Sequence, residues 1–463
     1  TKRVYEVKFT YNGEVKATRY ATNGQSIHGG MPTFTAKDLL GTGYNPHHYY
    51  AIAFEGGFNA STPVNADRKV DITLAEKDCY EIASKDNWKE FRDIVGNGQN
   101  AVDAKMTADV NLGSDIFMVG NSYAGTFDGQ GHTLKINWNG GSDSDIAPFY
   151  TVKNATIKNL RTEGEIKSST HFLSGLICNA YGTVTISGCV SNVNITSSYD
   201  KGGCNAAGMI ECVRDNAKVT ITDCLVKGKF TATTKNGKTY MGGFVCNQYG
   251  TCTLTNCLYA SENNATGGYT FASTYFSGTT LNNCYYLNAC GKAQGTQVTK
   301  AQLKNGYVAH KLQGTREETV WGQVLGTDTV PQPTAEAAKH VYEVKFTYNG
   351  EVKATRYANK GGHVSLPTVQ ELLGADYAPN ITYALSFEGD FSASSTVTGN
   401  TTVVANVVFK DISIATKEDW KKFCELVRSG EGKLNARLTA DIDLGGDIQK
   451  IGSESTDYSG TFD

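Results

Sequence analysis

Acidic side chains inside two related motifs are the first candidates for chemistry in this chain of 463 residues. The candidate carboxylates are Asp109, Asp115, Asp441, Asp443 and Asp447. Clustered carboxylates can bind Ca²⁺ or serve as the acid and base of glycoside hydrolysis. Asn111 stands in the first motif where Asp443 stands in the second, so the charged cluster is not repeated. We therefore expect Asp109 and Asp441 to cap turns, with calcium binding and catalysis as the alternatives.

Histidines and nucleophiles show no pattern typical of a catalytic site or a metal site. His47 and His48 are adjacent and could bind a metal, but Asn380 and Ile381 stand at the corresponding place of a second copy. His132 follows a glycine-containing turn that lacks the GxGxxG spacing of a phosphate-binding loop. No GxSxG motif occurs. We therefore expect that the chain is not an enzyme and that it has no catalytic residue, no metal and no cofactor.

The 12 cysteines do not have the spacing of a zinc site, because no CxxC pair occurs. We expect most of them to be reduced and buried as small apolar side chains. Disulfides in an oxidising compartment are the alternative. Cys178, Cys212 and Cys246 recur at equal intervals along the chain and are candidates for one interior row.

Five copies of a short pattern indicate which elements position the other cysteines. Each copy has an aliphatic residue, a polar residue, then Asn, Asp or Gly, and finally a small apolar residue or Leu. The third positions are Asn159, Gly188, Asp223, Asn256 and Asn283. The fourth positions are Leu160, Cys189, Cys224, Cys257 and Cys284. Their spacing of roughly 30 residues, with variable insertions, is typical of a solenoid.

The residues before these patterns alternate between apolar and polar, as in Val184 and Ile186 or in Val219 and Ile221. This alternation predicts strands with one buried face. The chain must turn at each third position, where Asn, Asp and Gly tolerate a left-handed corner. Stacked units of this kind predict an all-β chain with a right-handed parallel β-helix and an interior ladder of the fourth-position residues. A β-sandwich of unrelated short strands is the alternative.

Residues 4–21 and residues 341–358 are identical, and looser matches continue after both, among them Trp88 with Trp420. The chain is thus one module and part of a second. Each module is expected to open with a small β domain, followed by a helix that caps a β-helix. The predicted domains are small β domains at 1–77 and 337–410, the β-helix with its capping helix at 78–336, and a truncated second β-helix at 411–463. We expect the chain to be a fragment of a longer tandem array.

The net charge of −3 and a pI near 6.3 give no electrostatic case for nucleic acid or an anionic membrane. No apolar run approaches the roughly 18 residues that span a bilayer. Tyrosines beside predicted turns could stack on sugar rings, or pack along the rungs instead. They are Tyr181, Tyr249, Tyr259, Tyr269, Tyr275, Tyr285 and Tyr286. Any ligand is expected at the loops that interrupt the repeat, residues 196–205, 232–240 and 260–270.

Several motifs resemble GLUG-motif β-helix domains of Bacteroidetes-type bacterial surface proteins. The motifs are TADVNLG at 107–113, YAGTFDGQGHTL at 123–134, VWGQVLGTDTVP at 320–331, and strands led by Gly175, Gly208 and Gly243. The chain departs from the family motif at its final glycine, where Cys178, Glu211 and Cys246 stand. The small domains look loosely like the β-grasp repeats of bacterial surface proteins, or like small sandwiches.

The resemblance implies a secreted or cell-surface protein with a structural or adhesin-like role, and it supplies no catalytic residues. Combined with the duplication, it leads to the hypothesis of an extracellular repeat protein that forms a stalk, fibre or filament. An adhesin-type module that binds a glycan or a host protein is the first alternative. A polysaccharide-active β-helix enzyme is the second. The expected partners are a glycan, a host surface protein or further copies in an array, with no nucleic acid and no membrane span.

Overall fold

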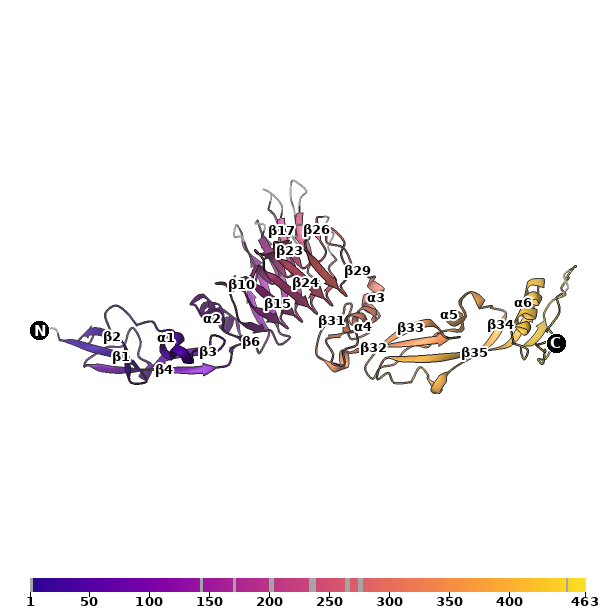
Figure 1. Ribbon diagram of the computed structural model, residues 1–463, viewed down its shortest axis with the longest axis horizontal. Coiled ribbons are helices and arrows are strands. Elements are labelled where there is room, and N and C mark those ends of the chain that lie inside the picture. Colours follow the sequence, from indigo (N-terminus) through magenta and orange to yellow (C-terminus); the bar gives the residue numbers. More distant parts are fainter. Residues whose placement is uncertain are drawn as a thin grey trace. The chain divides into compact units, whose positions relative to one another are not determined.

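The computed structural model describes residues 3–141, 145–169, 172–199, 204–232, 239–262, 267–273, 278–446 and 449–463. The chain divides into two compact units, Thr1–Thr299 and Lys300–Asp463, and each is considered on its own. Strands predominate in both units, and the helices are few and short (Figure 1). No helix in these described ranges is long and apolar enough to cross a membrane.

The first unit opens with a small four-stranded sheet. Its strands are β1 (Val4–Tyr11), β2 (Glu14–Thr22), β3 (Tyr49–Phe54) and β4 (Arg68–Lys77), in the order β2-β1-β4-β3. The connections hold helix α1 (Ala36–Leu40) and the 3-10 turns η1 (Gly41–Gly43) and η2 (Glu55–Gly57). β1 pairs antiparallel with β2 and parallel with β4. The alternation along β1 buries Val7 and Phe9 completely.

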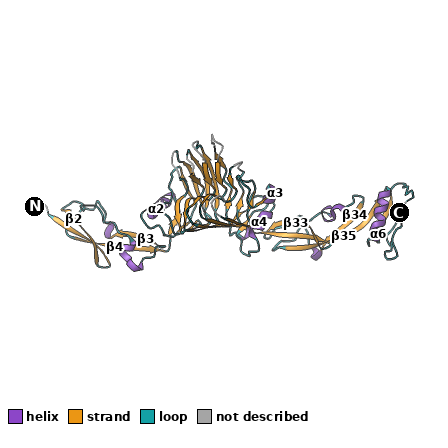
Figure 2. Cartoon of the chain, turned by 45° about the horizontal axis from the view of Figure 1, so that its top comes forward, coloured by secondary structure: helices purple, strands orange, loops and turns teal. Residues whose placement is uncertain are grey.

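A parallel β-helix comes next in the same unit, which confirms the fold class predicted from the sequence (Figure 2). One long sheet contains, in spatial order, β27 (Thr279–Asn282), β24 (Thr251–Thr255), β19 (Lys218–Thr222), β15 (Thr183–Ser187), β11 (Thr156–Lys158), β8 (Thr126–Asp128), β6 (Ala104–Met106) and β5 (Tyr80–Ile82). Its neighbouring strands are all parallel.

The other faces of the β-helix are three further parallel sheets. The longest contains β29 (Thr296–Gln297), β28 (Tyr285–Tyr286), β25 (Leu258–Tyr259), β20 (Leu225–Val226), β16 (Val190–Ser197), β12 (Arg161–Ser168), β9 (Thr133–Asn139) and β7 (Val110–Gly113), with β21 (Phe230–Ala232) also beside β16. The second contains β10 (Phe149–Lys153), β14 (Ile177–Tyr181), β18 (Ile210–Val213) and β23 (Val245–Gln248). The third contains β13 (Phe172–Ser174), β17 (Cys204–Ala207), β22 (Thr239–Gly242) and β26 (Gly268–Tyr269).

The corners of the β-helix have the left-handed backbone that the sequence pattern predicts. The φ angles are 52° at Asn159, 62° at Gly188, 53° at Asp223, 52° at Asn256 and 52° at Asn283. Corner side chains also bond along the stack, because Asn283 Nδ2 donates to Asn256 Oδ1 over 2.8 Å. At the Asn159 corner, Nδ2 donates to Asp128 Oδ1 over 3.1 Å. These bonds satisfy amide groups that the tight corner would otherwise leave exposed.

Helix α2 (Lys85–Gly96) covers the start of the β-helix. It begins at the N-cap residue Ser84, whose hydroxyl accepts from the amide of Asn87. Trp88 and Phe91 are fully buried in the β-helix core. The Trp88 indole N–H donates to the carbonyl of Phe117 over 2.7 Å. The helix therefore closes an apolar end that would otherwise face water.

The second unit starts with a closing segment, defined as residues 300–340. It contains α3 (Lys300–Lys304), α4 (Tyr307–Gln313), β30 (Trp321–Gly322), β31 (Gln332–Pro333) and the 3-10 turn η3 (Ala337–Lys339). The sequence assigned residues up to 336 to the β-helix domain, whereas contacts group the closing segment with the sheet that begins at Val341. The domain limits inferred from the sequence stay a prediction.

The rest of the second unit repeats the start of the first. Its sheet has the order β33-β32-β35-β34, formed by β32 (Val341–Tyr348), β33 (Glu351–Asn359), β34 (Ile381–Phe387) and β35 (Thr401–Ile414). The connections hold α5 (Val369–Leu373), η4 (Gly374–Asp376) and η5 (Glu388–Asp390). Helix α6 (Lys417–Arg428) comes after the sheet, and β36 (Asn435–Leu438) pairs parallel with β35.

Candidate functional site

The five ladder residues lie at equivalent positions of successive rungs. The paired strands place Ile157, Ile186, Ile221, Leu254 and Leu281 level with one another. Three positions later stand Leu160, Cys189, Cys224, Cys257 and Cys284, none more than 4% exposed. Burial raises the pKa of the Cys224 and Cys257 thiols well above the ordinary value. These thiols are therefore protonated at neutral pH and serve in packing rather than as nucleophiles.

The single interior row expected for Cys178, Cys212 and Cys246 is wrong. The registers of β14, β18 and β23 place Cys178 and Cys246 level with Glu211, and place Cys212 one position further along. Cys212 is instead level with Asn179 and Asn247, so it stands outside the row of Cys178 and Cys246. Cys178, Glu211 and Cys246 each lie three residues after a glycine, and this count gives the correct row. The equal intervals between the three cysteines do not.

Glu211 stands between the two thiols of that row as a buried carboxyl group. Its Oε1 accepts a hydrogen bond from Asn247 Nδ2 over 2.7 Å, while its Oε2 has no partner in the described part of the chain. Burial raises the pKa of Glu211 to about 8, so the group is mostly protonated at neutral pH. Burial also raises the pKa of Cys212 to about 12. The cluster thus holds neutral groups, and it offers neither a thiolate nor a charged base.

Three of the predicted acidic candidates, Asp109, Asp115 and Asp443, have separate partners, and the turn-capping role of Asp441 stays a prediction. Asp109 Oδ1 accepts from the amide of Thr133 over 2.8 Å, a bond to the first residue of the neighbouring strand β9, and its turn-capping role stays a prediction. Asp115 forms an ion pair with Lys85 instead. In the second copy, Asp443 Oδ1 accepts from the amide of Gly445 over 2.8 Å. Asp447 lies outside the described residues, and no cluster of three potential metal ligands occurs among those described.

The adjacent histidines also point to different partners. His47 Nδ1 lies 3.1 Å from Asp103 Oδ1, and His48 Nδ1 lies 2.5 Å from Glu76 Oε1. His132 Nδ1 lies 3.2 Å from Asp109 Oδ1. Each imidazole is thus paired with one carboxylate in a surface contact.

The predicted tyrosines divide between the interior and the surface. Tyr259, Tyr285 and Tyr286 are buried, which is the packing role left open from the sequence. Tyr249 is 45% exposed and is the most accessible of those described. Tyr275 lies outside the described residues, as do residues 200–203, 233–238 and 263–266 of the three loops expected to bind a ligand.

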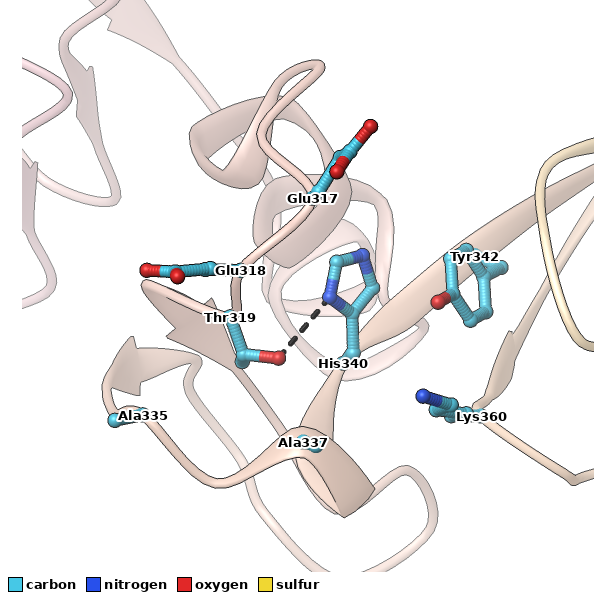
Figure 3. A pocket seen from close by; sticks show the side chains of 8 residues that line it. All are labelled: Glu317, Glu318, Thr319, Ala335, Ala337, His340, Tyr342 and Lys360. Atoms are coloured by element: carbon cyan, nitrogen blue, oxygen red, sulfur yellow. Dashed lines mark hydrogen bonds between the residues drawn. The ribbon is translucent and has the colours of Figure 1, made fainter.

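A pocket of about 260 Å³ in the second unit was not anticipated from the sequence (Figure 3). Its lining residues are Glu317, Glu318, Thr319, Ala335, Ala337, His340, Tyr342 and Lys360. The His340 ring stacks on Tyr342 with 4.4 Å between ring centroids. Its Nδ1 lies 3.1 Å from the Thr319 hydroxyl. Burial lowers the pKa of His340, and the nearby charges of His310 and Lys360 act in the same direction.

The pocket can donate and accept hydrogen bonds around a small polar ligand. Lys360 offers an ammonium group, Glu317 and Glu318 offer carboxylates, and the neutral imidazole offers one donor and one acceptor. A hydroxyl 3.1 Å from an imidazole is also the spacing of a nucleophile and its general base. Among the described residues, no carboxylate hydrogen-bonds His340 to orient it.

The buried Glu211 and the His340 pocket were both missed from the sequence, but only Glu211 had left a signal in it. Glu211 was visible as a departure from the family motif, and a carboxyl group in an otherwise apolar row indicates a special position. The pocket had no such signal. Its residues come from three stretches around 317–319, 335–342 and 360, which only the packing of the closing segment brings together.

No protein-family model and no curated protein matches this chain. The resemblance to GLUG-motif domains is therefore not shown, although the parallel β-helix is. Among solved structures, the chain is similar to one described as a "putative immunoglobulin A1 protease from Bacteroides ovatus". The TM-score is 0.39 at 15% sequence identity, and the similarity covers 56% of this chain and 93% of that one.

This comparison contradicts one prediction made from the sequence. We expected that the chain is not an enzyme, but the structure found by the comparison carries the name of a protease. We therefore withdraw that prediction. The lack of a catalytic motif in the sequence was too weak a basis for it, because catalytic groups are recognised by their geometry and come from distant parts of a chain.

Proposed function

We propose that this chain is part of a secreted or surface-exposed repeat protein in which small β domains and β-helices alternate to form a stalk, fibre or filament. The observation that carries the proposal is the structural repeat. β1 and β2 share their register with β32 and β33, including the irregularity after Phe9 in the first copy and after Phe346 in the second. Identical sequence has thus produced the same hairpin twice.

The elements after the two hairpins support the same proposal. In the first copy, Tyr80 pairs with Ala104, and Ala104 pairs with Phe127. In the second copy, Ile412 pairs with Ala436, and Ala436 bridges to Phe462. Each capping helix also supplies a Trp whose indole N–H donates to a later carbonyl. The strand pairing after both hairpins thus starts alike, which supports a modular array.

Each rung of a β-helix advances by about 4.8 Å, so stacked rungs provide length from a repeated sequence. Negative-stain electron microscopy of a tandem chain with three or more modules tests the proposal. The expected particles are strings or filaments whose length increases with the number of modules. Compact particles whose length does not increase with module number would contradict it.

A second candidate function is binding of a glycan, and the His340 pocket is the observation that favours it. Its volume of about 260 Å³ suits one sugar ring, and its acidic, basic and hydroxyl side chains can bond to sugar hydroxyls. A glycan array with the full chain, compared with Lys360→Ala, tests this candidate. Binding that the variant loses would support it, and equal signals from both proteins would contradict it.

A further inference from the structure

One face of the duplicated hairpin has different surroundings in the two copies. The first opening face is defined as Val4, Glu6, Tyr20 and Thr22, which pair across β1 and β2 as Val4 with Thr22 and Glu6 with Tyr20. The second opening face is the equivalent set, Val341, Glu343, Tyr357 and Asn359. Only the last position differs in residue type. Because side chains alternate along a strand, all four members of each set point away from the core of their sheet.

The closing segment covers the second opening face at its apolar part. A Cβ atom added to Gly306, the N-cap of α4, would lie 2.8 Å from Tyr357 Cβ and 2.9 Å from Val341 Cγ1. The Tyr357 ring also contacts Tyr307 and His310, with ring centroids 6.3 and 5.8 Å apart. The backbone of the closing segment thus lies directly on this face.

Polar contacts also hold the closing segment on the second opening face. His310 Nε2 lies 3.8 Å from Glu343 Oε2, and the Tyr357 hydroxyl donates to Glu343 Oε1 over 3.3 Å. Asn359 donates through Nδ2 to the carbonyl of Gln323 over 2.6 Å and accepts at Oδ1 from the amide of Leu325 over 2.9 Å. The covering is therefore a specific fit of shape and hydrogen bonds.

The first opening face is the more exposed of the two. Val4 is 59% exposed where Val341 is 1% exposed, and Tyr20 is 53% exposed where Tyr357 is partly buried. The Glu6 side chain is 37% exposed, against 13% for Glu343. Val15 gives an internal reference, because both it and its equivalent Val352 are 52% exposed. The exposure of the hairpin tip at Val15 and Val352 is thus the same in both copies, whereas the opening faces differ.

We propose that the first opening face is a docking surface for a closing segment of the kind formed by residues 300–340, supplied by a neighbouring module. The inference rests on the proposed function, because the occupant is a part of another repeat. Three of the four receiving side chains are identical to those that already bind such a segment. At the fourth position, the Thr22 hydroxyl lies 3.2 Å from His28 Nε2 and would exchange that contact for one of the two hydrogen bonds of Asn359.

A neighbouring module in the same polypeptide is the source favoured by the connection in the second unit. There the closing segment runs directly into β32 through η3, so the segment and its face are held at a high effective concentration. The α4 helix also places His310 Nε2 within 3.8 Å of Glu343 Oε2 on the second face. The same complementarity is available at Glu6 of the first face.

The test is an extended chain in which a second copy of residues 300–340 is fused directly ahead of Val4, which reproduces the junction between His340 and Val341. Hydrogen exchange is followed on peptides that include Thr22 or Asn359, because the identical sequences are otherwise indistinguishable by mass. In the native chain, amides of 4–22 should exchange faster than those of 341–359. The extension should slow the first hairpin by about tenfold or more, to the rate of the second.

Matched variants separate docking from general stabilisation. Tyr20→Ala in the extended chain should abolish most of the added protection, whereas Val15→Ala should retain it. In the native chain, Tyr307→Ala with His310→Ala should speed exchange of 341–359 toward the rate of 4–22. This second arm tests the contact even if the extension fails to fold.

The proposal is overturned if the extension leaves exchange of 4–22 unchanged, or if the double variant leaves 341–359 protected. Protection of 4–22 in the native chain that increases with protein concentration would assign the face to a second copy of the chain and would also overturn it. Electron microscopy of tandem chains reports on the array independently. Docking can thus fail while filaments form, and filaments can fail to form while docking is seen.

Discussion

The two copies of the opening hairpin share one sequence, one register and one bulge, yet their side chains differ in exposure. The difference at Val4 and Val341 comes from what lies beside each hairpin, because the closing segment covers the second copy alone. Identical local sequence thus determines identical strands, while burial is determined by distant residues. Exposure in a repeat protein is accordingly a property of neighbouring modules as much as of the repeat itself.

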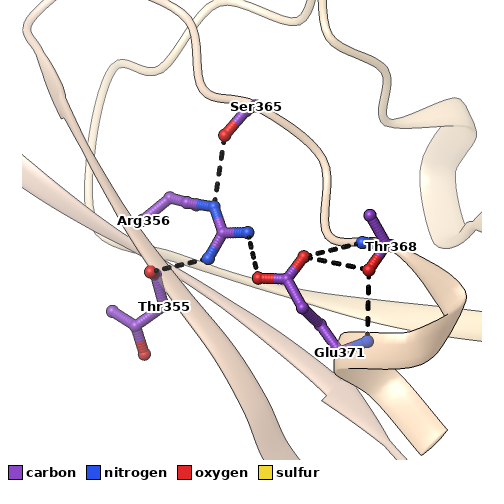
Figure 4. Close-up of polar contacts among 5 residues, drawn as sticks. All are labelled: Thr355, Arg356, Ser365, Thr368 and Glu371. Carbon is purple, nitrogen blue, oxygen red and sulfur yellow. Dashed lines mark hydrogen bonds and ion pairs between the residues drawn. The ribbon is translucent and has the colours of Figure 1, made fainter.

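A second difference concerns the arginine of the hairpin (Figure 4). In the second copy, Arg356 Nη2 donates to Glu371 Oε1 over 2.7 Å and its Nε donates to Ser365 over 3.2 Å. In the first copy, Arg19 Nε donates to the carbonyl of Gly30 over 3.3 Å. The helix position of Glu371 is Asp38 in the first copy, and among the described residues the Asp38 carboxylate hydrogen-bonds only with Thr35, in the capping box. The Asp38 side chain is one methylene shorter than that of Glu371. It therefore takes part in the helix cap but not in an ion pair with the arginine.

The regions that follow the two small sheets differ in how much covers them. Phe127 is fully buried and packs on Phe149 at 5.3 Å, whereas its equivalent Phe462 is 40% exposed. Leu438 is 41% exposed where Met106 is fully buried. Another rung of the β-helix covers the first region, so helix α2 contributes to a larger core than its equivalent α6 does.

The largest effect should come from removing the capping tryptophan in each copy. Trp88 is fully buried and contacts Phe91, Phe127 and Phe149, so Trp88→Ala should cost about 4 kcal/mol of unfolding free energy. Trp420 is only partly buried, and Trp420→Ala should cost about 2 kcal/mol. Segment-resolved hydrogen exchange separates the two units, which a single melting curve would not. Equal losses in both copies would contradict the comparison.

The two units should also respond differently to pH, because the first contains Glu211. Its folded pKa of about 8 lies above the unfolded value, so folding takes up a proton between these values. The stability of the first unit should therefore fall as pH rises from about 4.3 to about 8 and be level above that. Glu211→Gln remains neutral and keeps an acceptor for Asn247, so it should remove this slope and stabilise the unit at pH 8 by on the order of 3 kcal/mol.

Denaturant unfolding of the first unit at several pH values measures this slope. Glu163→Gln is the matched control, since that carboxylate is a surface group with a 42% exposed side chain. The control should leave the slope unchanged. A Glu211→Gln protein that loses stability between pH 5 and pH 8 as steeply as the parent would refute the prediction.

The two opening faces give a third comparison, between the stability costs of replacing equivalent tyrosines in the same chain. Tyr357 packs against Tyr307 and His310, so Tyr357→Ala should cost about 2 kcal/mol in the second unit. The equivalent Tyr20→Ala removes an exposed ring and should change the first unit by less than about 0.5 kcal/mol. Urea titrations read by hydrogen exchange give both values. A similar cost for both variants would show that the hairpin itself, and not its covering, sets the energy.

The sequence predicted what repeats locally and missed what packing brings together. The corners at Asn159, Asp223 and Asn256 were predictable because a left-handed residue between two buried positions leaves few alternatives. The row through Glu211 was not obtained from the equal cysteine spacing alone, because one additional residue shifts Cys212 by one register position. The His340 pocket and the covering of Tyr357 depend on contacts between the closing segment and a sheet later in the chain, and periodicity contains no information about such contacts.

The smallest effect should be at the carboxylate that differs between the copies. Glu371 accepts from the Thr368 amide over 2.8 Å and from Arg356, and these bonds hold its pKa below the usual value, with the backbone bond the larger cause. A depressed folded pKa means that this contribution is complete above about pH 4.3 and is lost as pH falls below it. Glu371→Gln should cost the second unit about 1 kcal/mol at pH 7 and nothing near pH 2.

Asp38→Asn in the first copy removes a capping carboxylate that has no arginine partner, so its cost at pH 7 should be the smaller of the two. Side-by-side urea unfolding of both variants at pH 7 and at low pH measures the difference. Because the two hairpins have the same arginine, a larger cost at Asp38 than at Glu371 would mean that the Arg356 ion pair adds nothing. The capping box alone would then account for both copies.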